Sequence, residues 1–231
     1  TEQSEKIAVF NLDYTLDEYW SLESATNFSK IEYELRGDTD ATELTSFPIN
    51  IYQFQEYAFS QEFKAFYQND WLNSVFAVYH SNIRRDTNND RTSLIQVPFG
   101  EAVVPLILHY NLLDNVENKN IALYTSNDIT IGDNWIVNLG LRYDKETVST
   151  LSVNNPTRLN NLGPYNDTVD TLIADSTSPG EGEESYNVFL PRMSVTYKIT
   201  NDVNVSAVYS TGYRSGGLSV NIARGEAVPY D

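Results

Sequence analysis

Apolar and polar side chains alternate strictly along a stretch near the C-terminal end of the chain. After position 202 one face collects the apolar residues Val203, Val205, Ala207, Tyr209 and Tyr213. Between 193 and 199 the same alternation leads into a turn at 200–202. Because a period of two residues is typical of a β-strand, the pattern predicts two strands joined as a hairpin. Both are expected to exceed ten residues, whereas strands in soluble sheets usually have five or six.

The same period predicts six earlier strands, at about 5–16, 19–35, 55–67, 71–84, 120–131 and 135–150. The last of these shows the pattern clearly. Its apolar residues have odd numbers from 135 to 143, and its polar or small residues have even numbers from 138 to 146. The strand at 71–84 is expected to place three residues opposite His80, namely Val75, Ala77 and Tyr79.

The predicted connections alternate in length. Those near positions 17, 69, 133 and 201 are short, whereas those that start near 37, 85, 152 and 216 are long. Transmembrane β-barrels have this asymmetry, with short periplasmic turns, long extracellular loops and tilted strands of about nine to eleven residues. Trp20, Trp71 and Trp135 each stand beside a short turn, where a barrel carries a girdle of aromatic residues. The apolar faces would then contact lipid and the polar faces a wet lumen.

These features predict an all-β fold, an antiparallel transmembrane β-barrel to which the chain contributes about eight strands. If the short turns are periplasmic, the predicted strands start and finish outside the cell, on the wrong side for a complete bacterial barrel. We therefore expect residues 1–231 to form one domain from the interior of a larger, incomplete barrel. A soluble β-sandwich binding module is an alternative, and it predicts that the apolar faces are buried beneath a second sheet.

Charge and composition exclude several other classes. The net charge of −17 argues against a nucleic-acid partner, because phosphate binding needs clustered Lys and Arg. The chain has no Cys, and its two His residues lie far apart, so we expect no catalytic residue, no metal site and no cofactor. Residues 86–90 begin like a calcium loop, but Arg91 stands where that motif needs Gly, and a solvated loop is the expectation.

Three stretches resemble TonB-dependent outer-membrane receptors. Residues 59–63 (FSQEF) resemble a family strand that is followed by a turn and a Trp-containing strand, here starting at Trp71. Residues 134–144 (NWIVNLGLRYD) resemble the family's GLRYD strand. Residues 189–192 (FLPR), 195–197 (VTY) and 213–217 (YRSGG) resemble its F-P-R, T-Y and GYRSGG run. The order and spacing of the three make the match more specific than any one of them.

The resemblance implies a 22-stranded barrel with an N-terminal plug, in the outer membrane of a Gram-negative bacterium. Such a receptor would import a scarce small-molecule ligand, such as a ferric siderophore, with energy passed on by the TonB complex. The plug and the TonB-contacting segment are absent from these residues. The implied partners are therefore outer-membrane lipid, the ligand and, through the missing plug region, the TonB complex. A passive porin or an adhesin-type barrel is the alternative of a different class.

Three arginines are expected on the polar faces of successive strands, namely Arg142, Arg192 and Arg214. Salt bridges from them to carboxylates of a plug would hold it in place, since buried charges need partners. The alternative is pairing within the wall, for example with Asp144 or Glu146, and this simpler interpretation is favoured.

Candidate ligand contacts lie in the two longest predicted loops. Apolar residues from 97 to 113 carry His109 and Tyr110 and suggest a lid or a ligand platform. The favoured alternative is that this segment packs against neighbouring loops as a small core. Tyr165 is the third candidate, in the acidic loop from 152 to 185, which we expect to be hydrated and mobile.

Overall fold

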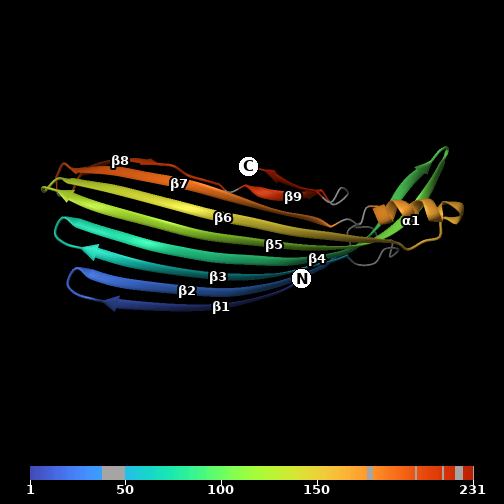
Figure 1. Ribbon diagram of the computed structural model, residues 1–231, viewed down its shortest axis with the longest axis horizontal. Helices are drawn as coiled ribbons and strands as arrows, with labels where there is room; N and C mark the ends of the chain where they lie inside the picture. The colour runs from blue at the N-terminus through green and yellow to red at the C-terminus, as the bar shows by residue number, and fades with distance from the viewer. Residues whose placement is uncertain (38–49, 176–178, 201, 215, 222–225, 231) are drawn as a thin grey trace.

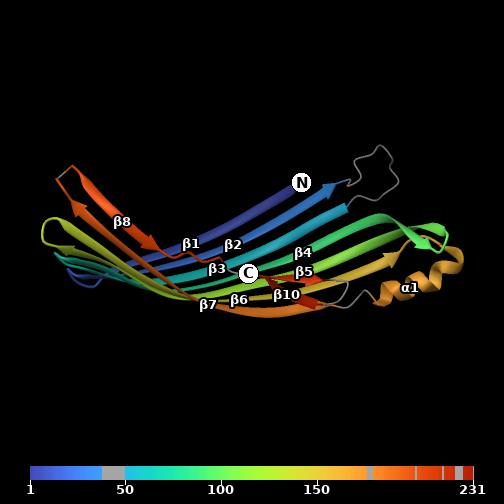
Figure 2. The same ribbon diagram turned by 90° about the horizontal axis from the view of Figure 1, so that it is seen from above.

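The computed structural model describes residues 1–37, 50–175, 179–200, 202–214, 216–221 and 226–230. All ten strands among them belong to one sheet. They are β1 (Glu2–Thr15), β2 (Trp20–Gly37), β3 (Asn50–Gln68), β4 (Leu72–Phe99), β5 (Ala102–Ile131), β6 (Trp135–Arg158), β7 (Gly180–Lys198), β8 (Asn204–Ser210), β9 (Gly217–Asn221) and β10 (Glu226–Tyr230). β1 to β8 follow one another in an antiparallel meander, as predicted, and form a long curved layer (Figures 1 and 2).

All four short turns lie at one end of the sheet, where β1–β2, β3–β4, β5–β6 and β7–β8 are joined (Figure 1). Side chains accept backbone hydrogen bonds at three of these turns, and at the β7–β8 connection the acceptor is the Thr200 hydroxyl group. The Asp17 carboxylate accepts hydrogen bonds of 2.8 Å from the backbone N–H groups of Tyr19 and Trp20. The Asn69 side-chain oxygen accepts bonds of 3.1 and 2.8 Å from the backbone N–H groups of Trp71 and Leu72. The three tryptophans lie at this same end of the sheet. The predicted short turns, and the predicted position of a tryptophan beside three of them, are therefore confirmed.

The polarity of the sheet is inverted relative to a soluble protein. On β6 the enclosed residues are polar, with Asp144 and Glu146 only 5% and 8% exposed, while Leu139 and Leu141 are 41% and 46% exposed. Val205, on β8, is 59% exposed. We call the side that carries Leu139 and Leu141 the apolar face, and the side that carries Asp144 the polar face. The sandwich alternative is wrong, because no second sheet covers the apolar face of the described residues.

Strand β4 departs from this simple pattern. Val75, Ala77 and Tyr79 do lie opposite His80, but the pairing of Ala77 with Tyr124 places them on the polar face. The apolar face of β4 is carried by Phe76 and Val78, which are both 48% exposed. Apolar residues therefore occupy both sides of this strand, and periodicity alone does not show which side meets the lumen.

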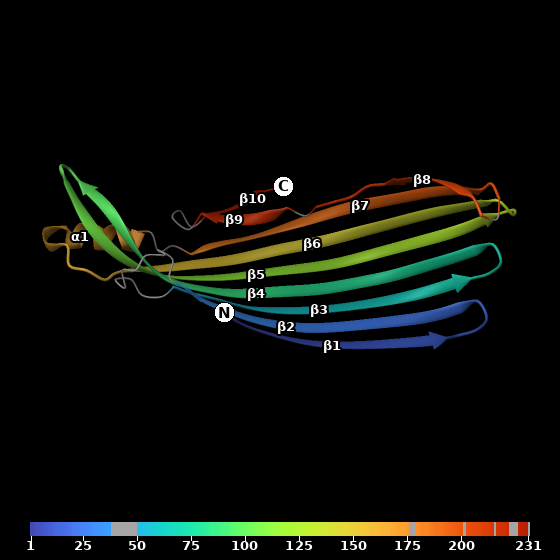
Figure 3. The ribbon, with the colours of Figure 1, turned by 180° about the vertical axis from the view of Figure 1, so that it is seen from behind.

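The structure corrects the predicted long loop from 85 to 118. β4 and β5 remain paired through this region up to the pair Phe99 and Ala102, so a two-residue turn at 100–101 replaces the loop. Gly100 has a φ of 64°, the left-handed conformation that glycine adopts without strain. The hairpin reaches beyond the neighbouring strands, as Figure 3 shows.

Three further predictions, two about connections and one about a strand, are wrong. In the described part of the segment from 152 to 185 the predicted loop is replaced by regular structure, because β6 continues to Arg158 and is followed by η1 (Gly163–Tyr165) and α1 (Asn166–Asp175). The eighth strand ends at Ser210 and has seven residues. The chain after 216 forms the β9–β10 hairpin, which is attached to β7 by one parallel pair, Glu226 with Glu181. Among the described residues no helix combines the length and apolar character that crossing a membrane requires.

Candidate functional site

An aromatic cluster lies on the polar face at the end of the sheet opposite the short turns. Tyr33 of β2 and Phe54 of β3 are direct partners in the register, and their rings stack with centroids 5.1 Å apart and planes at 21°. Tyr52 lies two residues before Phe54 on the same side of β3, and its ring centroid is 6.3 Å from that of Tyr33 and 6.2 Å from that of Phe54, edge-on to both. The three half-buried rings form one surface.

A guanidinium group covers this aromatic surface. Arg85 of β4 places its guanidinium carbon 5.0 Å from the centroid of the Phe54 ring. Glu56, its partner in the register, accepts a hydrogen bond of 2.8 Å from its Nε. The Arg85 side chain is still half exposed, so part of its charge faces open space. We call Tyr33, Tyr52, Phe54, Glu56 and Arg85 the mouth site.

A second arginine stands on an aromatic ring further out on the same face. Arg91 of β4 pairs with Tyr110 of β5, and its guanidinium carbon lies 5.2 Å from the ring centroid. Arg85 and Arg91 are six residues apart, which is roughly 20 Å along a strand. Between them Asp114 accepts a hydrogen bond from Ser152, and burial raises the pKa of this carboxyl group. The polar face thus carries two arginines that each lie over an aromatic ring, one at Phe54 and one further out at Tyr110.

The outer part of the β4–β5 hairpin packs on residues 159–174, and we call this unit the cap. Leu106, Leu108, Leu162 and Val169 form its buried core. The Phe99 and Tyr165 rings stack over it at 4.5 Å. The favoured alternative for the apolar segment from 97 to 113 is confirmed, since it packs against the neighbouring connection.

An ion pair fastens helix α1 to the sheet. The Nε and Nη2 atoms of Arg158, the last residue of β6, each donate a bond of 2.8 Å to the Asp170 carboxylate. These hydrogen bonds hold the pKa of Asp170 below its usual range. Asn160 adds two bonds to the backbone of β5, at Pro105 and Ile107. The acidic connection is therefore ordered by specific contacts.

The structure separates the three candidate ligand residues. Tyr110 and Tyr165 both pack against the core of the cap. His109 lies on the opposite side of β5, where its Nδ1 is 3.4 Å from the Thr92 hydroxyl group and 3.6 Å from Asp90. The rings of Tyr110 and Tyr165 thus build the cap, and only Tyr110 also touches an arginine.

The three candidate plug arginines also differ in their surroundings. Arg142 pairs with Asp144 through two bonds of 2.7 Å and lies over the rings of Tyr79 and Tyr124, so it is paired within the wall, as the alternative predicts. Arg192 shares the polar face with it, but among the described residues no carboxylate lies within salt-bridge distance. Arg214 lies beyond the end of β8, so strand alternation does not define its face.

The calcium-like segment does not form a metal site in the described part of the chain. Asp86 and Asp90 of the calcium-like segment lie inside β4, which corrects the expectation of a solvated loop. Within the same part of the chain, no three His, Cys, Asp or Glu side chains come together as a metal site would need.

Sequence reasoning missed the mouth site. The alternation in β2 weakens near Ile31, and the predicted third strand begins only at about 55, so Tyr52 and Phe54 fall outside the predicted strands. A signal was present, because Tyr52 and Phe54 alternate with Gln53 and Gln55, although in the opposite phase to Tyr57 and Phe59. The contact with Arg85 carried no signal, since it depends on the register between β3 and β4.

A curved antiparallel sheet with an exposed apolar face and an enclosed polar face defines the wall of a transmembrane β-barrel. The chain belongs to the family described as TonB dependent receptor-like, beta-barrel, whose model matches residues 2–230. Members of this family are transport receptors of the Gram-negative outer membrane. No curated protein sequence matches the chain.

Solved structures of outer-membrane receptors share this fold. The ferric yersiniabactin uptake receptor FyuA from Yersinia pestis is 17% identical, with a TM-score of 0.73 over 99% of this chain and 31% of its own. The ferric-catecholate import receptor Fiu from E. coli K12 is 12% identical, with a TM-score of 0.59 over 94% and 36%. The siderophore receptor PiuA from Acinetobacter baumannii is 13% identical, with a TM-score of 0.57 over 97% and 34%. The chain thus spans about a third of each.

Proposed function

We propose that this chain forms part of the wall and the extracellular mouth of a TonB-dependent importer, and that the ligand is a ferric siderophore with aromatic groups. The observation that carries the proposal is the mouth site, an aromatic surface with a half-exposed guanidinium group. Its place on the polar face, beyond the membrane part of the strands, is where an incoming ligand would first meet the barrel. The protein is a carrier in this proposal and not an enzyme.

The chemistry of the mouth site suits such a ligand. Rings of a catecholate or phenolate chelate can stack on Tyr33, Tyr52 and Phe54, and aromatic pairs contribute about 0.5–1.5 kcal/mol beyond the area that they bury. A ferric chelate with net negative charge gains a further contact from Arg85, whose planar donors suit carboxylate and catecholate oxygens. FyuA, Fiu and PiuA, whose fold this chain shares, are receptors for ferric yersiniabactin, for ferric catecholates and for siderophores respectively.

The larger assembly follows from the same proposal. The sheet has free edges, and unpaired backbone groups in lipid cost several kcal/mol each, so further strands of the protein would complete the barrel. A plug inside it would meet Arg192 on the polar face, and would pass on energy from the TonB complex. Arg142 is paired with Asp144 and lies over the rings of Tyr79 and Tyr124. In this proposal these two rings form part of the wall surface that the plug contacts.

Ligand binding by the full-length protein in detergent tests this function. Quenching of intrinsic fluorescence by ferric catecholate and ferric phenolate siderophores measures the affinity, and growth under iron limitation measures uptake. Phe54→Ala is expected to weaken binding by about 1–2 kcal/mol, roughly fivefold to thirtyfold. Gln55→Ala is the matched control, because Gln55 is adjacent on β3 and lies on the other face. Equal affinities of the two variants, or failure of every siderophore to bind, would refute the assignment.

A further inference from the structure

The row of the sheet that carries the mouth site also contains a half-buried carboxylate. The register joins five residues of β2 to β6 as direct partners on the polar face, namely Tyr33, Phe54, Thr87, Asp114 and Ser152. Phe54 and Asp114 are two strands apart, which is roughly 10 Å. Thr87 lies between them and has a short side chain, so a ligand stacked on the Phe54 ring can extend across it to Asp114.

The charge of Asp114 is not neutralised by the wall. Ser152, which is 3% exposed, donates a hydrogen bond to this carboxylate. Among the described residues no Lys, Arg or His side chain lies within salt-bridge distance of it. Burial raises the pKa of the Asp114 carboxyl group, which is the direction expected where no positive charge offsets the loss of water.

Arg85 lies nearby but bonds to a different carboxylate. Its direct partner on β5 is Val116, and Asp114 is the diagonal neighbour two residues away. Diagonal neighbours in a sheet lie about 7–8 Å apart, within reach of a long side chain. The guanidinium group of Arg85 nevertheless bonds to Glu56 on β3, with 2.8 Å from Nε to the carboxylate. The polar face here thus carries two carboxylates beside one arginine.

A carboxylate is not needed to link β5 to β6. On the same face of the same two strands, the Asn138 side chain donates a bond of 3.1 Å to the Ser126 hydroxyl group, so a neutral pair can make this link. Deeper in the wall the enclosed carboxylate Asp144 is neutralised by Arg142. Because a charge removed from water needs a partner of opposite charge, Asp114 is suited to bind a cation that comes from outside the wall.

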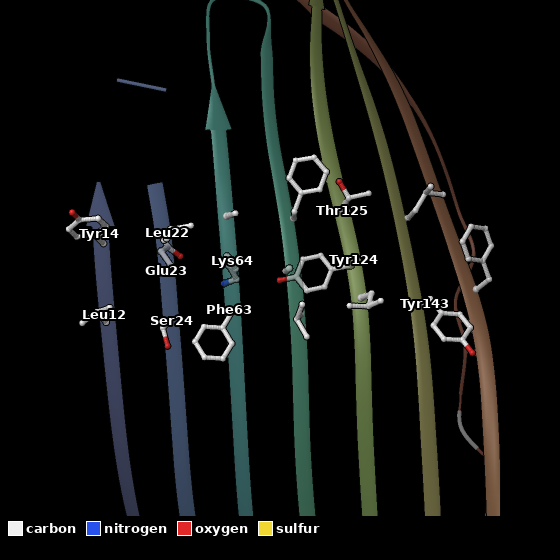
Figure 4. A pocket seen from close by; sticks show the side chains of 17 residues that line it. Leu12, Tyr14, Leu22, Glu23, Ser24, Phe63, Lys64, Tyr124, Thr125 and Tyr143 are labelled. Atoms are coloured by element: carbon white, nitrogen blue, oxygen red, sulfur yellow. The ribbon is translucent and has the colours of Figure 1, made fainter. Parts of the chain in front are cut away.

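The hollow on the other face of the wall is of a different kind. It extends from β1 to β7, and Figure 4 shows Leu12, Phe63 and Tyr143 among the side chains that line it. These residues belong to the apolar face, which meets lipid in the proposed function. A charged ligand therefore finds its partners on the polar face, at the mouth site and at Asp114.

We propose that the imported chelate carries a protonated amine in addition to its aromatic chelating groups, and that Asp114 binds this amine. The inference deepens the proposed function and rests on it. The rings of the chelate stack on Tyr33 and Phe54, and its anionic oxygens contact Arg85. Its ammonium group lies roughly 10 Å from the stacked rings and bonds to Asp114. An ammonium group has three donors, and an ionised carboxylate has acceptor sites beyond the one that Ser152 occupies.

Two ligands that differ in one charge test the inference. Both are ferric complexes of tris(2-aminoethyl)amine with two catecholamide arms, and the third arm ends in a free primary amine in one and in an acetamide in the other. Fluorescence quenching of the full-length protein in detergent measures both affinities. The wild type is expected to bind the free-amine chelate about tenfold to a hundredfold more tightly, because hydrogen bonds between charged groups are stronger than neutral ones.

A conservative variant separates the charge of Asp114 from its structural contact. Asp114→Asn keeps an oxygen that can accept the bond from Ser152, and is expected to bring the ratio of the two affinities to about one. Glu117→Gln is the matched control. Glu117 lies on the opposite face of β5 and accepts a side-chain bond of 2.9 Å from Asn82, so its loss of charge should leave the ratio as in the wild type.

The outcomes distinguish this inference from the proposed function. Equal affinities of the wild type for the two chelates would overturn the inference and leave the proposed function standing. A ratio that Asp114→Asn does not change would also overturn it. Failure of both chelates to bind would overturn the proposed function and this inference together. The wild-type comparison needs no variant, so the test remains decisive if Asp114→Asn does not fold.

Discussion

The guanidinium carbon of Arg85 lies 5.0 Å from the centroid of the Phe54 ring, on the polar face of the sheet. Arg84, its neighbour on β4, instead pairs with Asp86 on the apolar face. Two adjacent arginines of similar exposure thus lie on opposite faces of the wall, and only Arg85 belongs to the mouth site. This division makes them natural controls for each other.

Arg85→Gln should weaken siderophore binding by about 1–2 kcal/mol, because it removes both a cation over an aromatic surface and charge-assisted donors. Titration of the full-length protein in detergent measures the change. Arg84→Gln should bind the siderophore with wild-type affinity. A loss of affinity in both variants would point to a general effect of charge and contradict the assignment.

The two faces of the wall can be distinguished at adjacent positions. Leu12→Arg places a charge on the apolar face, where Leu12 is 53% exposed, and should cost about 2–4 kcal/mol of folding free energy in a bilayer. Asn11→Arg, at the same depth on the polar face, should be much milder. The yield of folded protein in outer membranes and its unfolding in urea measure both. Equal costs would show that the faces are assigned wrongly.

The Arg142–Asp144 pair should stabilise the wall. Asp144 is 5% exposed, so Asp144→Asn leaves Arg142 without its carboxylate in an enclosed site and should cost about 1–3 kcal/mol. Urea unfolding in detergent micelles measures this cost. The double variant Arg142→Met/Asp144→Leu should be less destabilised than Asp144→Asn, because it leaves no unpaired charge. If it is more destabilised, the pair contributes net stability.

The cap should loosen when its core is reduced. Leu106 is 5% exposed within the core, and Leu106→Ala should cost about 2–5 kcal/mol of the local opening free energy. Hydrogen exchange of residues 159–174 should then become faster. Leu172→Ala is the control, since Leu172 is 58% exposed on α1 and its loss should leave exchange unchanged. Equal exchange in both variants would show that the core does not hold the helix.

Docking of α1 should depend on pH through Asp170. Its pKa is lowered in the folded protein by hydrogen bonds from Arg158, so the ion pair stabilises docking above the ordinary carboxyl pKa of about 3.9. This stabilisation is lost as the pH falls through the lowered value. A fluorophore on Leu172→Cys should report undocking at acid pH. In an Arg158→Gln background that pH-dependent step should disappear, and its persistence would exclude this pair as the cause.

Much of the wall was predictable, because the alternation of apolar and polar side chains along a strand depends only on neighbouring residues. Strand alternation from 193 to 199 and around Leu139 identified the exposed apolar side correctly, since neighbouring residues on a strand point to opposite faces whatever the partner strand is. The same local rule failed for the connections. The segment with Pro98 and Pro105 reads locally as a loop, yet pairing between β4 and β5 extends through both prolines.

The sequence by itself determined the strands, the short turns with their tryptophans, and the faces of seven of the eight wall strands, because these follow from residues within one or two positions of each other. Only the tertiary structure decided which face of β4 is enclosed, how α1 packs on the hairpin, and that Tyr33, Phe54 and Arg85 meet. Those contacts depend on the register between strands that are about 20 to 30 residues apart, and register is set by the pairing of whole strands. Local periodicity therefore predicted the strands of the wall, whereas the contacts of the mouth site were decided by the pairing of whole strands.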